Sequence, residues 1–189
     1  AQFNSNQYWR YGADVNLASS ANYMRDYRIT GYGADVLSSD AYIEGFGTGA
    51  YSRIDGTAFQ GLNAGVINQS ELPFVLPRYQ YYFTGTPDRL GGRFSLGTSD
   101  FNIYRANGTS DQRGQISLNW DRPFHDRWGQ MFVFTAHLDS SVYKATKLDL
   151  LPNYAGINAA TTAQALPTAA LKMNWPFLKS MRNSSVILE

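Results

Sequence analysis

The stretch GQISLNWD, residues 114–121, alternates apolar and polar side chains along most of its length. Ile116, Leu118 and Trp120 share one parity, and the residues between them are polar. Because successive side chains of a β-strand point to opposite faces, this pattern predicts a strand with one apolar and one hydrophilic face. After the turn-like RPFHDRWG, residues 122–129, the segment 130–143 largely alternates in the same way. The two segments are therefore predicted to form an antiparallel hairpin with aromatic residues near its turn.

Nine segments in all are predicted to be strands. They span residues 8–18, 41–49, 53–62, 74–83, 92–103, 114–121, 130–143 and 165–175, with a last strand beginning near Ser184. Compact connections (near Ala50, 84–91, 122–129 and 176–183) alternate with mostly longer, polar ones (19–40, 63–73, 104–113 and 144–164). Outer-membrane barrels have short periplasmic turns and long outer loops. We therefore predict an all-β fold, an antiparallel up-and-down section of a transmembrane β-barrel that forms an incomplete open sheet.

Composition agrees with strands that cross a membrane. Of 189 residues, 15% are aromatic and only 16% are charged. No apolar run reaches the roughly 18 residues that a membrane helix requires, so any crossing must be made by strands. The mean hydropathy of −0.35 fits a barrel with a wet lumen as well as a soluble protein. The net charge of +1 and the absence of a basic stripe give no reason to expect nucleic acid as a partner.

Two segments depart from simple alternation. In 92–103 the apolar residues change parity near Asp100, which predicts a β-bulge there. Pro77 interrupts 74–83 near its outer end, where a missing N–H is tolerable only at an edge, a strand start or a bulge.

Parity divides the side chains into two predicted sets. The predicted lumen-facing residues are Asp14, Arg78, Arg93, Gln115, Asn119, Thr135, His137, Asp139 and Lys172. The predicted lipid-facing or interfacial residues are Leu118, Trp120, Trp128, Phe132, Phe134, Leu171 and Trp175. Aromatic rings of membrane barrels gather at the depth of the lipid headgroups, so those beside the compact turns indicate the periplasmic rim. Alternatively, the same rings would form the core of a soluble β-protein.

The sequence predicts no catalytic residue, no cofactor and no metal site. His125 adjoins Asp126, and His137 shares a parity with Asp139, so each pair could be a base with its orienting carboxylate. However, no serine in a GxSxG setting accompanies them, and two histidines a strand apart lack the spacing of metal ligands. With zero cysteines there is also no thiolate ligand and no cysteine nucleophile. We therefore expect these pairs to be hydrated polar groups.

Several segments together resemble the barrel region of the LptD family, the outer-membrane proteins that assemble lipopolysaccharide. They are YMRDY (23–27), SSDAYIEGFGTGAYSR (38–53), NWDRPFHDRWGQ (119–130) and ALPTAALKMNWPF (165–177). The resemblance spans nearly the whole chain, and it rests on the order and spacing of the segments. It implies a large barrel in the outer membrane of a Gram-negative bacterium, with a periplasmic β-jellyroll, an LptE-type lipoprotein plug in the lumen and a lateral opening between the terminal strands.

The sequence departs from the complete family pattern in two respects. The jellyroll is absent, and the last residues, SSVILE, fall within a predicted strand. Residues 1–189 are therefore expected to be one partial outer-membrane β-barrel domain, an interior section of the wall without the jellyroll and the closing strands. The resemblance consequently assigns no gate residue to any position.

Three functions fit the sequence. The first is translocation of lipopolysaccharide, with lipopolysaccharide, the plug lipoprotein, outer-membrane lipid and the remaining strands and jellyroll of the full-length protein as partners. In that reading the lumen charges either contact the lipopolysaccharide headgroup or the plug, or form a solvated wall. The second function is that of a general porin or efflux barrel. The third is a soluble glycan-binding β-sandwich, which would leave the membrane fraction without detergent.

Overall fold

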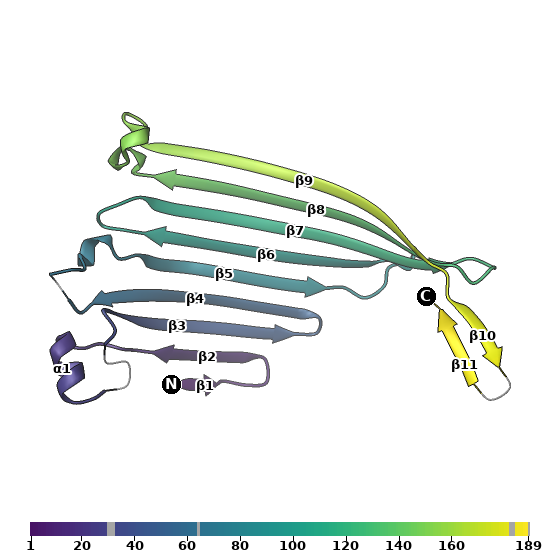
Figure 1. Cartoon of the computed structure of the whole chain (residues 1–189), viewed down its shortest axis with the longest axis horizontal. Helices are drawn as coiled ribbons and strands as arrows, with labels where there is room; N and C mark the ends of the chain where they lie inside the picture. Colours follow the sequence, from purple (N-terminus) through teal and green to yellow (C-terminus); the bar gives the residue numbers. More distant parts are fainter. Residues whose placement is uncertain (30–32, 64, 182–183, 189) are drawn as a thin grey trace.

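Nine strands lie side by side in one sheet, in the order of the sequence, in the computed structural model of the chain (Figure 1). The structure describes residues 1–29, 33–63, 65–181 and 184–188, and within 177–188 only the backbone. Each strand is antiparallel to its neighbours, and β1 and β9 form the two edges. The predicted all-β, up-and-down open sheet is thus confirmed.

The strands of the sheet are β1 (Gln2–Asn4), β2 (Trp9–Asp14), β3 (Val36–Gly47), β4 (Ala50–Gly61), β5 (Phe74–Thr84), β6 (Arg93–Tyr104), β7 (Ser110–His125), β8 (Met131–Thr146) and β9 (Ala159–Asn174). Short helices interrupt three connections: α1 (Ala21–Asp26), η1 (Gln69–Glu71), η2 (Leu148–Leu150) and η3 (Pro152–Tyr154). A separate hairpin, β10 (Phe177–Met181) and β11 (Ser184–Leu188), follows β9.

Several strand boundaries differ from the predicted ones. β7 continues through Arg122 to His125, so the turn before β8 is shorter than predicted, and β9 begins at Ala159 rather than Ala165. Polar and proline residues at these ends obscured the alternation, but pairing with β8 keeps them in the sheet. β1 was not predicted. The strand predicted near Ser184 is β11, which pairs with β10 and not with the main sheet.

The predicted bulge near Asp100 is wrong. β6 pairs with β7 without a break from Arg93 to Ile103, so the odd-numbered apolar residues at its outer end share the hydrophilic face. The irregularity instead lies in β5, where the pairing with β6 shifts between Val75 and Arg78. Pro77 falls within this shift, one of the places where a strand tolerates a missing N–H.

The two ends of the sheet differ in character. α1 and the three short η helices gather at one end, and the compact turns lie at the other (Figure 1). One predicted long connection is short, because only residues 105–109 separate β6 from β7.

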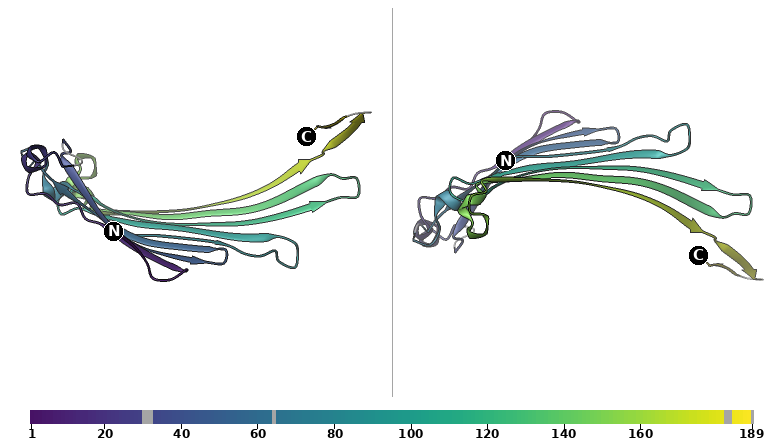
Figure 2. Two further views of the ribbon diagram at one scale, coloured as in Figure 1. Left: turned by 90° about the horizontal axis from the view of Figure 1, so that it is seen from below. Right: turned by 90° about the horizontal axis from the view of Figure 1, so that it is seen from above.

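At the compact end each successive hairpin from β1–β2 to β7–β8 extends further than the one before (Figure 1). The sheet is also curved in both edge-on views (Figure 2). Stagger and curvature are what a barrel wall requires for closure.

The sheet has a single layer and almost no interior. Among the described residues, the only buried hydrophobic side chains are Met24, Ala145 and Leu148, all at the loop end. Large apolar side chains in mid-strand remain open, and Leu171 is 61% exposed. A β-sandwich buries such side chains between two packed sheets, so the sandwich interpretation is wrong. No helix of the described part is long and apolar enough to cross a membrane.

Register places the apolar side chains of neighbouring strands on one common face. Trp120 of β7 lies opposite Phe94 of β6 and Ala136 of β8, and Phe134 of β8 lies opposite Leu171 of β9. Directly opposed residues of an antiparallel pair share a face. The same face continues to β2, where Trp9 and Tyr11 lie on it. We call this side the apolar face and the other the polar face.

The two faces predict opposite effects for two adjacent arginine substitutions in a bilayer. Leu118→Arg puts a charge on the apolar face, where near the bilayer midplane it should cost about 2 to 4 kcal/mol of folding free energy. Asn119→Arg puts the same charge on the polar face and should cost little. Denaturant unfolding of the full-length protein in lipid vesicles measures both values, and equal losses would contradict the assignment of faces.

Candidate functional site

All nine residues predicted to face the lumen lie on the polar face. They are Asp14 of β2, Arg78 of β5, Arg93 of β6, Gln115 and Asn119 of β7, Thr135, His137 and Asp139 of β8, and Lys172 of β9. The direct pairs Asn119–His137 and Asp121–Thr135 show how the register aligns them. The polar face therefore carries hydrophilic side chains on every strand from β2 to β9, with some apolar residues, such as Phe101 and Ile103, between them.

The apolar face receives five of the seven residues predicted to contact lipid or its interface. These are Leu118, Trp120, Phe132, Phe134 and Leu171. Trp128 lies in the turn between β7 and β8, with the guanidinium of Arg127 4.8 Å from its ring centroid, and Trp175 follows β9. Strand parity does not assign these last two residues to a face. Both lie at the compact end of the sheet.

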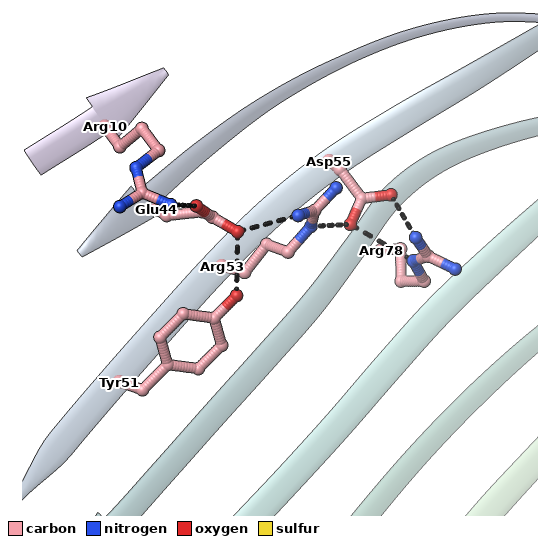
Figure 3. A network of polar contacts seen from close by, with 6 residues as sticks. All are labelled: Arg10, Glu44, Tyr51, Arg53, Asp55 and Arg78. Carbon is pink, nitrogen blue, oxygen red and sulfur yellow. Dashed lines mark hydrogen bonds and ion pairs between the residues drawn. The ribbon is translucent and has the colours of Figure 1, made fainter. Parts of the chain in front are cut away.

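A row of alternating positive and negative side chains crosses four strands on the polar face (Figure 3). We call Arg10, Glu44, Arg53, Asp55 and Arg78 the charge ladder. Arg53 Nη1 donates to Glu44 Oε1 at 2.7 Å, and Arg53 Nε donates to Asp55 Oδ1 at 2.9 Å. Arg78 Nη2 lies 2.9 Å from Asp55 Oδ2, and Arg10 Nη1 lies 3.7 Å from Glu44 Oε2. Each carboxylate thus lies between two guanidinium groups.

Burial separates the middle of the charge ladder from its ends. The side chains of Glu44 and Asp55 are 10% and 2% exposed, whereas those of Arg10 and Arg78 are 43% and 46% exposed. A carboxylate that is buried away from water needs cationic partners, because without them its charge is uncompensated. The outer arginines remain accessible, so each can meet an anionic or hydroxyl-bearing molecule on this face.

Aromatic side chains support the charge ladder from two sides. Tyr51 Oη donates to Glu44 Oε1 at 3.0 Å, and the guanidinium of Arg53 lies 4.5 Å from the ring centroid of Tyr42. The ring of Tyr42 also covers Gly12, where an added Cβ would lie 2.7 Å from the ring. Glycine at this position therefore lets Tyr42 lie flat between the backbone of β2 and Arg53.

The sequence predicted parts of the charge ladder but not its assembly. Arg78 was predicted to face the lumen, and Glu44 and Asp55 were not singled out. The Thr48–Gly49 turn is the sequence signal that could have identified Glu44 and Asp55. Gly49 has φ +68°, as two-residue hairpin loops require. A two-residue loop at this place sets Glu44 opposite Arg53. The glycines near that turn left too little side-chain pattern to fix the register from the sequence.

A second hydrogen-bond network crosses β7 and β8. His137 Nε2 lies 2.8 Å from Asp139 Oδ2, and Asp139 also accepts from Ser117 Oγ. Nearby, Asp121 accepts from Thr135 Oγ1 at 2.7 Å and from the side-chain amide of Asn119. Ser117 contacts the carboxylate rather than the imidazole, so the arrangement lacks the nucleophile–base contact of a hydrolase.

The other His–Asp pair considered from the sequence, His125 and Asp126, lies at the β7–β8 turn. Asp126 Oδ1 accepts from the backbone N–H groups of Trp128 at 2.9 Å and Gln130 at 3.0 Å, so its carboxylate stabilises the β7–β8 turn beside His125. Within the described part of the chain, no group of three His, Cys, Asp or Glu residues could hold a metal ion.

At the compact end, Asp88 ties a turn to the apolar face. Its carboxylate accepts from Trp120 Nε1 at 2.9 Å and from the backbone N–H groups of Leu90 at 2.8 Å and Gly92 at 2.9 Å. The hydrogen bond from Trp120 is the main cause that lowers the pKa of Asp88 below its ordinary value. The backbone hydrogen bonds lower this pKa further, and together they outweigh the desolvation that raises it. An added Cβ at Gly92 would overlap the Trp120 indole, so glycine leaves room for it.

A single-layer, staggered antiparallel sheet with one apolar and one polar face is the architecture of a β-barrel section. The sequence comparison gives the particular family. The family model LptD, described as LPS transport system D, matches residues 1–189, and the chain belongs to the LptD family. These are transport proteins of the outer membrane of Gram-negative bacteria, not enzymes, and they act on lipopolysaccharide. The predicted resemblance is confirmed. No curated protein matches the sequence.

Breaking the charge ladder at its most buried acid should weaken the folded barrel. Asp55→Ala leaves Arg53 and Arg78 without their shared carboxylate, but Arg53 keeps Glu44 and Arg78 is partly hydrated, so we expect a loss of about 1–3 kcal/mol in the free energy of unfolding. Asp40→Ala is the matched control on the same face, because Asp40 lies opposite Asp14 and makes no ion pair among the described residues. Urea unfolding of the full-length protein in vesicles should separate the two variants, and equal effects would contradict the role of the ladder.

The contact between Asp88 and Trp120 should depend on pH. Because the pKa of Asp88 is lowered on folding, the stabilisation is present above its unfolded pKa and is lost as pH falls through the folded pKa. Acid titration of Trp120 fluorescence, taken as the difference from Trp120→Phe, should show this transition. Asp88→Asn should abolish it. A transition that persists in Asp88→Asn would assign the titration to another group.

Proposed function

We propose that residues 1–189 form an interior section of the barrel wall of a lipopolysaccharide translocon. The polar face lines the lumen, and the apolar face contacts the bilayer. The lumen carries the saccharide part of lipopolysaccharide toward the outer leaflet, and no bond is made or broken. Membership of the LptD family supports this substrate, and it favours lipopolysaccharide transport over a general porin or efflux barrel.

The observation that carries the proposal is the separation of the two faces over the central part of the sheet. The charge ladder and the β7–β8 network lie on one side, and Trp120, Phe134 and Leu171 lie on the other. In hydrocarbon, an exposed guanidinium or carboxylate is costly, whereas water hydrates it without loss. The polar face therefore belongs to the aqueous lumen.

The chemistry of the polar face suits a saccharide that carries phosphate and carboxylate groups. Arg10 and Arg78 present accessible guanidinium groups, which bind phosphate in a fixed geometry. Gln115, Asn119 and Thr135 offer amides and a hydroxyl for sugar hydroxyl groups. Because these contacts are distributed along the wall rather than gathered in a pocket, they favour passage over retention.

Further strands complete this wall in the proposal. β1 and β9 present unpaired backbone groups at the edges of the described sheet, and in hydrocarbon each such group costs several kcal/mol. Strands elsewhere in the full-length protein would pair with these edges, and a periplasmic jellyroll would deliver the substrate. A lumen plug of the LptE type would then contact the polar face, where lipopolysaccharide passes.

Photo-crosslinking in living cells tests the proposal. A photoreactive amino acid at Gln115 or Asn119 of the full-length protein should capture lipopolysaccharide or the plug lipoprotein, because both positions lie on the polar face. The same residue at Leu118 or Phe134 should capture bilayer lipid. Leu118 and Asn119 are matched neighbours on opposite faces of β7, so local differences in expression or depth are small.

Two outcomes would contradict the proposal in different ways. Lipopolysaccharide captured only from Leu118 and Phe134 would reverse the inside and the outside of the wall. Capture of neither lipopolysaccharide nor a plug from any polar-face position would remove the translocation role of this section.

A further inference from the structure

The apolar face carries a hollow of about 370 Å³ over β6 to β9. We call it the apolar groove; it is lined by Phe94, Leu118, Trp120, Ala136, Leu138 and Ala169, with Pro167 beside them. It is an open hollow on the surface of the sheet rather than an enclosed cavity. Its walls are mostly apolar, so a segment of hydrocarbon chain can lie along it.

The apolar groove is a consequence of register. Ala136 of β8 lies directly opposite Ala169 of β9, so two small side chains adjoin in one row. Large side chains bound this row on both sides along the strands, with Leu138 on one side and Phe134 on the other. The ring of Trp120 closes the end of the row on β7, 6.1 Å from the ring of Phe134 between centroids.

A cation lies next to the apolar groove on the same face. Arg122 is two residues beyond Trp120 on β7 and lies opposite Phe134, so it projects from the apolar face toward the compact end. Its side chain is exposed, and its guanidinium lies 5.9 Å from the ring centroid of Phe124. Among the described residues it makes no ion pair, although its charge attracts the Asp88 carboxylate and helps to lower the pKa of Asp88. The exposed guanidinium can accept a second anion from the bilayer.

The depth of Arg122 matches a lipid headgroup. The rings of Phe124 and Phe132 stack 5.1 Å apart on the turn side of Arg122, and Trp120 lies on the other side. Aromatic belts of membrane barrels mark the level where hydrocarbon gives way to headgroups. A phosphate at Arg122 would thus lie at the bilayer interface, with hydrocarbon extending along the strands into the apolar groove.

We propose that the apolar groove and Arg122 form a binding site for one glycerophospholipid of the periplasmic leaflet. One acyl chain occupies the groove, and the phosphate pairs with Arg122. The inference rests on the facing given under the proposed function, because it requires the apolar face to contact the bilayer. The compact turns lie at the periplasmic end of such barrels. The position of the site, not its chemistry, therefore favours a phospholipid of the periplasmic leaflet over lipopolysaccharide of the outer leaflet.

Lipid photolabelling of the full-length protein in nanodiscs tests the site. The probe is a phosphatidylethanolamine with a diazirine in its acyl chain, and labelled residues are mapped by peptide mass spectrometry. We expect labels concentrated on Leu118, Ala136 and Leu138. Ala169→Trp fills the groove and should reduce this labelling several-fold, whereas Ala163→Trp, on the same strand and face opposite Val142, should not.

Arg122→Gln tests the phosphate contact without changing the shape of the groove. It should also reduce labelling at the groove, whereas Lys144→Gln, on the same face near the loop end, should leave it unchanged. Heat-modifiable migration of each variant on gels confirms that the barrel is folded. If Ala169→Trp does not fold, Arg122→Gln alone still decides the outcome.

Three results would overturn the inference, and they differ from a failure of the proposed function. Labels spread evenly over the apolar face and unchanged in Ala169→Trp and Arg122→Gln would show bulk lipid without a site. Displacement of the probe by unlabelled lipopolysaccharide, but not by phosphatidylethanolamine, would assign the groove to lipopolysaccharide. Labels on Asn119 and Thr135 instead of Leu118 and Ala136 would reverse the faces, and the proposed function would then fail as well.

Discussion

The hydrogen-bonded register between neighbouring strands is the constraint on which this structure depends. In a single-layer sheet there is no second layer against which a misplaced side chain could be buried, so each residue meets one of two surroundings according to its parity. A slip of one residue between two strands would move every side chain of one strand to the other face. The continuous pairing of β7 with β8, from Ser110–Thr146 to His125–Met131, therefore holds the division into two faces over the longest part of the wall.

The charge ladder shows how register produces a site that no local pattern contains. Arg10, Glu44 and Arg53 come from three strands and meet because the pairings Arg10–Glu44 and Glu44–Arg53 follow one another across the sheet. Buried ion pairs add little net stability compared with apolar packing, but a broken one is costly, so they penalise a wrong register. In the proposed lumen the ladder has two roles, since its inner groups hold the register and its outer arginines remain accessible.

Register also arranges the side chains of the apolar face, which in the proposed function contacts the bilayer instead of the lumen. Its side chains do not pack into a core, and Leu171 and Met173 are exposed. In the proposed function this exposure is favourable, because these side chains contact hydrocarbon rather than water. Where two alanines adjoin across β8 and β9 the wall is indented, and at the compact end Trp120 is held in place by Asp88. The face is thus an uneven surface with a defined depth, and such a surface can distinguish one lipid position from the next.

The amino-acid sequence alone located eight of the nine strands of the sheet, β2 to β9, and it indicated the two faces of the clearest of them and the family. The alternation of Ile116, Leu118 and Trp120 was sufficient for the two faces of β7, because the period of a strand is fixed by the backbone. The nine polar residues predicted from parity share one face for the same reason. Tertiary structure alone decided where the strands end, where β5 is irregular, and which charges and which small residues adjoin. These depend on pairing between strands distant in the chain, and neither Glu44 beside Arg53 nor Ala136 beside Ala169 can be read from one strand, because each pair exists only once the register is set.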